Sequence, residues 1–209
     1  MQTVESEQCS ACTQAMHTAP AEKQSICPGL ADRLFLLFSV FAIGASFGWV
    51  LEVCYRSLVA GHFVNPGFLH GPYLPIYGTG LVLIDILNWW QAKKPGHRRS
   101  LRFLASVLLQ TLAAGLIEFA TGFFFLRVFG LRLWDYSSNF GNLFGIICPS
   151  FLLAWAVLCA LYTRFLHVNV RRAAKALIAH RVGMFLLGCY CGVLLVDAFF
   201  SFWAAWAGF

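Results

Sequence analysis

The sequence predicts an all-α membrane protein, a polytopic bundle of about five transmembrane helices. Three observations support this: the composition, a series of long apolar stretches, and an uneven distribution of basic residues. Of the 209 residues, 59% are hydrophobic and 11% are charged, whereas soluble domains carry about 25% charged residues. The mean hydropathy is +0.71. A water-soluble fold of this size could not cover its surface with so few charges.

Five apolar stretches account for this composition. A helix needs about 20 apolar residues to cross the hydrocarbon core of a bilayer. The stretches lie near residues 34–59, 73–90, 101–129, 143–166 and 182–206. The second is the shortest, and the third is long enough to tilt or to extend beyond the bilayer. We therefore expect a transmembrane domain over residues 32–209.

The first 31 residues differ from the rest because they are polar and contain no aromatic side chain. This composition predicts a largely disordered cytoplasmic tail. Its residues Cys9, Cys12, His17 and Cys27 could in principle bind zinc, but free thiols are the stronger interpretation for a short tail in a reducing cytosol. We predict no bound metal and no cofactor.

The distribution of basic residues predicts how the chain is oriented in the membrane. Twelve of the fifteen Lys and Arg residues lie in the tail or near the loops after the second and fourth apolar stretches. Only Arg56, Arg127 and Arg132 fall on the other side of a five-helix arrangement. The positive-inside rule then places the N-terminus in the cytoplasm and the C-terminus outside. Topology thus explains the net charge of +6, and we expect a lipid bilayer as partner and no nucleic acid.

Acidic residues inside apolar stretches are the first candidate functional residues. A charge at the bilayer centre costs at least about 2.5–3.5 kcal/mol, so such residues usually face protein or water. A rise of about 1.5 Å per residue places Glu52, Glu118 and Asp197 about 22–27 Å along three outward-running helices. We therefore predict a shared polar cavity in the outer half of the bilayer, which would bind a cation, a proton or a polar substrate group.

A purely structural role for the same acids is the alternative. Glu52 could pair with Arg56, one helical turn away, and Glu118 could accept a hydrogen bond from a neighbouring Trp or Tyr. Asp85 lies near Asn88 on an inward-running helix, and we interpret it as a structural residue.

The two predicted outer loops contain further candidates. Residues 65–80 include three prolines and four glycines after Asn65, so the first part cannot form a regular helix. Irregular backbone at membrane depth requires burial in protein or contact with water. This segment is therefore a candidate re-entrant loop, the alternative being a surface loop followed by a helix that starts at a proline. We expect five residues to shape the outer mouth of the site: Asn65, Tyr77, Trp134, Asp135 and Tyr136.

The segment Val170–Arg181 has apolar residues on one face and Arg171, Arg172 and Lys175 on the other. This pattern is typical of an interfacial helix. A basic stop signal that happens to be helical explains it equally well.

Two common catalytic motifs are absent from the sequence. There is no G-x-x-x-x-G-K-[ST] phosphate loop and no H-E-x-x-H zinc motif. ATP hydrolysis by a phosphate loop within this chain is therefore excluded, and we assign no catalytic residue.

Five short motifs follow one another in the helical region. They read Gly48-Trp49-x-x-Glu52, Asn65-x-Gly67-Phe68-Leu69-x-Gly71-Pro72, Pro75-Ile76-Tyr77-Gly78-x-Gly80, Glu118-x-x-Thr121-Gly122 and Trp134-Asp135-Tyr136-Ser137. In this order they resemble a bacterial family called putative ABC-transporter type IV, or CmpB-like permeases, over roughly residues 38–155. The last two motifs are also similar to a family of small vertebrate transmembrane proteins. In one departure, Pro66 occupies a position where the bacterial family usually has Arg, so the ligand of this chain could differ.

The resemblance implies a permease-like subunit of the bacterial inner membrane that moves a substrate with a separate ATPase subunit. Five helices are few for a complete pathway, so a homodimer is expected. Two alternatives stay open. The chain could be a membrane enzyme that uses two facing carboxylates as acid and base on a lipid-linked or amphiphilic substrate, or it could be a non-catalytic scaffold or assembly factor.

Overall fold

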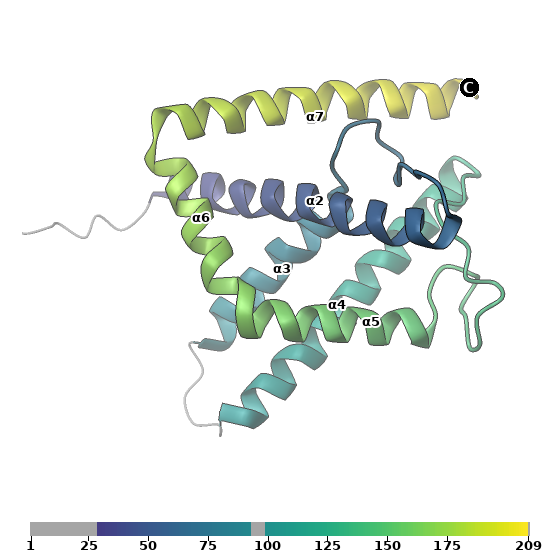
Figure 1. Cartoon of the computed structure of the whole chain (residues 1–209), viewed down its shortest axis with the longest axis horizontal. Helices are drawn as coiled ribbons and strands as arrows, with labels where there is room; N and C mark the ends of the chain where they lie inside the picture. Colours follow the sequence, from purple (N-terminus) through teal and green to yellow (C-terminus); the bar gives the residue numbers. More distant parts are fainter. Residues whose placement is uncertain (1–28, 93–98, 209) are drawn as a thin grey trace, which may run out of the picture. The chain divides into compact units, whose positions relative to one another are not determined.

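Helices make up most of the chain. The computed structural model describes residues 29–92 and 99–208, and the contacts below lie within the unit Leu34–Phe209. The elements are α2 (Leu30–Ala60), α3 (Pro75–Ala92), α4 (Arg99–Val128), α5 (Pro149–Leu161), the π-helix η1 (Tyr162–Leu166), α6 (His167–Ala179) and α7 (Arg181–Ala207) (Figure 1). The predicted disordered tail, its Cys9, Cys12, His17 and Cys27, and the basic residues 93–98 lie outside the described residues.

Four helical segments are long and apolar enough to cross a membrane: Leu30–Ala60, Ser100–Val128, Pro149–Ala179 and Arg181–Ala207. The remaining long helix, α3, has 18 residues and contains Asp85 and Asn88, which lower its apolarity. The described part of the chain has no strand beyond an isolated bridge between Leu143 and Ile147. The predicted fold class, an all-α polytopic membrane bundle, is confirmed.

The predicted fourth stretch differs most from the structure. Its helix begins at Pro149 rather than near residue 143, because Phe144 and Gly145 adopt left-handed backbone conformations with φ of 56° and 68°. Proline is favoured in the first turn, where its missing N–H is not needed. At the other end the helix continues through η1 into α6, and a π-helical turn is a known cause of bending. In Figure 1, α6 leaves α5 at a steep angle and leads to α7. The segment expected to be an interfacial helix is thus α6.

Two clusters of buried side chains hold these elements together. The first joins Ala45 of α2 with Leu69 and Tyr73 of the following loop, and side chains of α7 pack against it. The second joins Ile84 of α3 with Cys159 of α5 and Tyr162 of η1. A polar network extends the second cluster, in which the fully buried Gln110 bonds to Asn88, Ser106 and Thr163.

The loop between α2 and α3 returns to the middle of α2. The backbone N–H of Leu74 donates to the carbonyl of Ala45 over 2.9 Å, and Ala45 lies midway between the ends of α2. In Figure 1 the connection passes beside α7 before it reaches α3. Irregular backbone at the mid-height of a candidate spanning helix has the geometry expected for the predicted re-entrant loop.

Asp85 fixes α6 to α3. Its side chain is only 4% exposed and pairs with Arg171 at 3.2 Å and with His167 at 3.0 Å. Both partners lie on α6. The predicted structural role of Asp85 therefore has a definite form, a buried ion pair that determines where the basic helix packs.

We expect Arg171→Gln to lower the free energy of unfolding by about 2 kcal/mol, because it leaves a buried carboxylate without its charged partner. Arg172 is the matched control, since it is adjacent and exposed, and Arg172→Gln should change stability by less than about 0.5 kcal/mol. Unfolding of both variants in the same mild detergent would measure this. Equal effects would show that the Asp85–Arg171 pair does not stabilise the bundle.

Candidate functional site

A cavity of about 630 Å³ lies among five helices and the two long loops. Side chains of α2, α3, α4, α5 and α7 line it, together with the loop before α3 and with Leu133, Trp134 and Tyr136. Its size is within the range of about 300–1,000 Å³ that is usual for sites of small molecules. Most lining residues are apolar or aromatic, and among the described residues Glu52, Arg56 and Glu118 are its only charged side chains.

Glu52 contributes from the third-last turn of α2. Arg56, one turn further on, donates from Nε to Oε1 of Glu52 over 2.8 Å. The hydroxyl of Tyr77 on α3 donates to the other carboxylate oxygen over 2.7 Å. Both oxygens of Glu52 are therefore occupied, and its charge is balanced within the cavity.

Tyr77 can reach Glu52 because α2 and α3 approach closely. A Cβ atom at Gly48 would lie 2.3 Å from the Tyr77 side chain, and one at Gly78 would lie 2.7 Å from the carbonyl of Phe41. Small residues allow transmembrane helices to pack at such distances. Glycine at position 48 thus makes room for the aromatic ring that bonds to Glu52.

Glu118 contributes from α4 and is more deeply buried, with an exposed fraction of 4%. The hydroxyl of Tyr136 donates to one oxygen over 3.0 Å, and the indole N–H of Trp155 donates to the other over 2.9 Å. In the described part of the chain, no Lys, Arg or His forms an ion pair with Glu118. Both of its hydrogen-bond partners are therefore neutral donors, which supply no compensating positive charge.

Aromatic rings form the walls around the two carboxylates. The rings of Tyr77 and Trp155 have centroids 5.4 Å apart, and those of Tyr136 and Phe151 are stacked at 4.3 Å. All four residues line the cavity. Burial, followed by the charge of Glu118, raises the pKa of Tyr136 above its ordinary value, so its hydroxyl stays a neutral donor.

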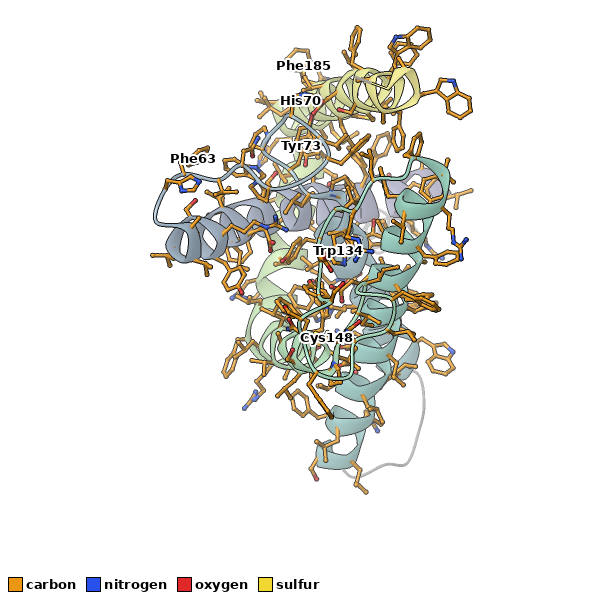
Figure 2. The ribbon with its side chains drawn as sticks, turned by 90° about the vertical axis from the view of Figure 1, so that its right-hand side faces the viewer. Phe63, His70, Tyr73, Trp134, Cys148 and Phe185 are labelled. Atoms are coloured by element: carbon orange, nitrogen blue, oxygen red, sulfur yellow. The ribbon has the colours of Figure 1, made fainter. Side chains whose placement is uncertain are left out.

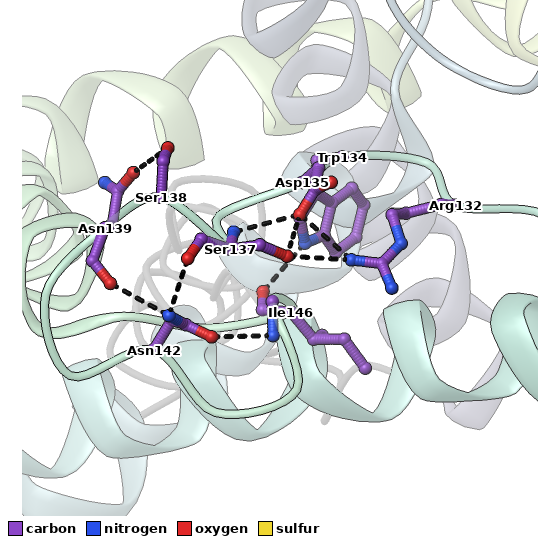
Figure 3. Close-up of polar contacts among 9 residues, drawn as sticks. Arg132, Trp134, Asp135, Ser137, Ser138, Asn139, Asn142 and Ile146 are labelled. Atoms are coloured by element: carbon purple, nitrogen blue, oxygen red, sulfur yellow. Dashed lines mark hydrogen bonds and ion pairs between the residues drawn. The ribbon is translucent and has the colours of Figure 1, made fainter.

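The loop before α5 presents Trp134 and Tyr136 to the cavity. The indole N–H of Trp134 donates to the carbonyl of Ile146 over 2.8 Å. Asp135 points elsewhere, where it accepts bonds from Ser137 and pairs with Arg132 at 2.9 Å (Figure 3). The hydrogen bonds from Ser137, and then Arg132, hold the pKa of the Asp135 carboxyl below its usual range. Asp135 thus stabilises the loop from its exposed side and does not line the cavity.

Asp197 is another predicted site residue that the structure places outside the cavity lining. Its carboxylate instead accepts bonds from the loop before α3. The backbone N–H groups of His70 and Gly71 donate to it over 3.0 and 2.9 Å, the Tyr73 hydroxyl donates over 2.6 Å, and Ser201 lies at 3.2 Å. In Figure 2, His70 and Tyr73 lie beside α7, whereas Trp134 and Cys148 lie on the other loop.

The predicted candidates therefore divide into two groups. The structure brings five of them to one cavity: Glu52, Tyr77, Glu118, Trp134 and Tyr136. Asn65, Asp135 and Asp197 do not line it, and Asn65 instead accepts a bond from the indole of Trp49 over 2.8 Å. The contacts of the structural alternative, from Arg56 to Glu52 and from Trp155 and Tyr136 to Glu118, are present as well.

Sequence reasoning missed Trp155 and the loop pair His70 and Tyr73. Trp155 carries a signal, because it lies in the middle of an apolar stretch where its N–H needs an acceptor. His70 and Tyr73 carry none, since only the three-dimensional path of the loop brings them to Asp197.

One known protein family matches most of the chain. The family described as Putative ABC-transporter type IV matches residues 39–202. The chain belongs to this family. The match and the apolar helices together make it a transporter-related multipass membrane protein. No curated protein and no solved structure matches the chain in these comparisons.

The position at which the sequence is expected to depart from the type IV pattern lies at the cavity. Pro66 is almost fully buried and is one of the lining residues. A charged residue at this position would face the same space as Glu52 and Glu118.

We expect Gly48→Ala to displace the Tyr77 ring and to break its bond to Glu52, because no Cβ fits at position 48. The variant should unfold at lower temperature, although alanine normally favours a helix by about 1 kcal/mol relative to glycine. Gly80→Ala on α3 is the control, since a Cβ there meets no atom within 4 Å. An unchanged or higher unfolding temperature for Gly48→Ala would contradict the close packing of α2 and α3.

We expect Asp197→Asn to loosen the loop before α3, because a neutral amide accepts weaker bonds than the carboxylate from the N–H groups of His70 and Gly71. Hydrogen bonds to charged groups contribute about 1.5–3 kcal/mol each, so hydrogen exchange over residues 61–74 should accelerate at least tenfold. Asp135→Asn is the reciprocal control and should affect residues 129–148 instead. Equal exchange of residues 61–74 in Asp197→Asn and the wild type would show that Asp197 does not hold this loop.

Proposed function

We propose that the chain is the permease-like membrane subunit of a transporter and that the 630 Å³ cavity is its substrate site. The observation that carries this proposal is that Glu52 and Glu118, from α2 and α4, face one largely apolar cavity. A buried carboxylate is costly in a membrane and is expected where a substrate or ion passes. Membership of the type IV family supports the assignment to transport.

The lining favours an amphiphilic substrate over a bare ion. The polar groups are concentrated around Glu52 and Glu118, whereas Phe68, Phe125 and Phe202 line the cavity with aromatic carbon. Among the described residues, no group of three or more His, Cys, Asp or Glu side chains is arranged to hold a metal ion. A molecule with a polar head and an apolar body matches both parts of the cavity.

Orientation and energy supply complete the proposal. With the N-terminus in the cytoplasm, as the basic residues predict, Glu52 and Glu118 lie in the outer half of their helices. The substrate would then enter or leave at the outer face or from the outer leaflet of the cytoplasmic membrane. A separate ATPase subunit would supply the energy, since the sequence contains no phosphate loop, and a homodimer would provide the helices that one chain lacks.

A cavity-filling variant tests the site. Ala154 lines the cavity, so Ala154→Phe should lower the amount of small molecule that co-purifies with the protein at least tenfold, equivalent to about 1.4 kcal/mol of binding free energy. Ala120 is exposed on α4 and does not line the cavity, so Ala120→Phe is the matched control. Mass spectrometry of extracts from folded protein in equal detergent would give both amounts. Unchanged ligand content in Ala154→Phe would rule out the cavity as the site.

A further inference from the structure

The charges that line the cavity do not balance. Glu52 is paired with Arg56 at 2.8 Å, which leaves the carboxylate of Glu118 as a second negative charge without a cation. The remaining lining residues are uncharged. With both acids ionised, the cavity therefore carries one net negative charge.

Neutral donors do not remove this imbalance. Tyr136 and Trp155 satisfy one hydrogen-bonding site on each oxygen of Glu118, but neither supplies positive charge. A buried unpaired charge costs far more than a buried pair. An occupant that carries positive charge would offset this cost, whereas an anionic occupant would increase it.

The rings beside the carboxylates also suit a cation. Trp155 and Tyr77 lie with centroids 5.4 Å apart, and each donates a hydrogen bond to one of the two acids. The faces of Trp and Tyr rings attract ammonium groups, and this attraction exceeds about 2 kcal/mol when the site is dry. The aromatic walls and the carboxylate thus favour the same kind of head group.

The apolar part of the cavity lies further along α4 than Glu118. Glu118, Thr121 and Phe125 all line the cavity from α4, and Phe125 lies seven residues after Glu118. That separation corresponds to about 10 Å along the helix. Phe125 contacts Phe68 and Phe202 with ring centroids 4.8 and 5.8 Å apart, so an aromatic cluster lies on the far side of the cavity from the acid.

We infer that the occupant is an amphiphile with a positively charged nitrogen head, bound with this head beside Glu118 and against the rings of Trp155 and Tyr77, and with its apolar chain along Phe125 and Phe202. The inference rests on the proposed function, since it names the substrate class of the same cavity. A cation selected by one carboxylate and two aromatic rings needs no metal and no second acidic residue.

Probes with one alkyl chain and different heads test the inference. Dodecyltrimethylammonium, dodecanol and dodecanoate differ in head-group charge, and their binding to the wild-type protein in nanodiscs would be measured by quenching of tryptophan fluorescence. We expect the cation to bind at least tenfold more tightly than the neutral or the anionic probe. The preference should persist at high salt, because dissolved ions screen a buried charge only weakly. Adsorption of the cation to charged groups on the surface should instead weaken as salt is added.

Two variants locate the preference. Glu118→Gln should bind cation and neutral probe with equal affinity, whereas Glu118→Asp, which keeps the charge, should retain the preference. Asp32→Asn is the control, because it removes an exposed acid that does not line the cavity. If Glu118→Gln does not fold, the wild-type protein still decides whether the cavity prefers a cationic head.

The outcomes separate the two proposals. If no probe binds, or if Ala154→Phe binds all three as the wild type does, the cavity is not the site and both proposals are overturned. If all three probes bind equally and Ala154→Phe abolishes their binding, the proposed function stands and the cationic head is wrong. A cation preference that survives in folded Glu118→Gln would also overturn the assignment to Glu118.

Discussion

The carboxylate of Asp197 supports the loop on which the rest of the site depends. Backbone N–H groups that lie away from water need acceptors, and a loop inside a helix bundle cannot find them along its own chain. Asp197 accepts bonds from the N–H groups of His70 and Gly71 and from the Tyr73 hydroxyl. The loop residues Pro66, Phe68 and Leu69 line the cavity. The hydrogen bonds that Asp197 of α7 accepts therefore hold these loop residues in position to line the cavity.

The positions of the two acids depend on close helix packing rather than on long side chains. Gly48 allows Tyr77 to reach Glu52, and at Gly122 a Cβ would meet Ile146 at 2.6 Å and Trp134 at 3.2 Å. The first contact fixes α3 against α2, and the second fixes the loop before α5 against α4. Each glycine thus places an aromatic residue that lines the cavity. Packing and electrostatics are therefore coupled. Tyr77 packs against Gly48 and also donates a hydrogen bond to Glu52, and Trp134 packs against Gly122 and also lines the cavity around the acids.

The sequence predicted the helices well because hydrophobic length alone indicates a membrane span. Starts and ends differ from the predicted stretches by a few residues, except at Pro149, where Phe144 and Gly145 interrupt the apolar run. The rise per residue of a helix also predicted that Glu52 and Glu118 lie at similar depths along their helices, and both do face one cavity. Asp197 shows the limit of this reasoning. Height along a helix says nothing about its rotation. Ser201, one turn from Asp197, is the second polar residue in this half of α7, and two residues form too weak an amphipathic pattern to indicate which way Asp197 points.

The two acids of the cavity differ in whether the chain itself supplies a cation to pair with them. Glu52 lies within reach of Arg56 and costs little, whereas Glu118 has only neutral donors. The two acids also come from different parts of the bundle, α2 and α4. A cationic occupant beside Glu118 would interact with α4 and α5 through Glu118 and Trp155, and with α3 through Tyr77. A ligand shifts a conformational equilibrium only by its difference in affinity between two states. Because the compensating charge would be supplied by the occupant and not by the chain, any state that separates α3 from α4 and α5 would lose part of that affinity, and binding would therefore favour the state in which these helices lie around the cavity.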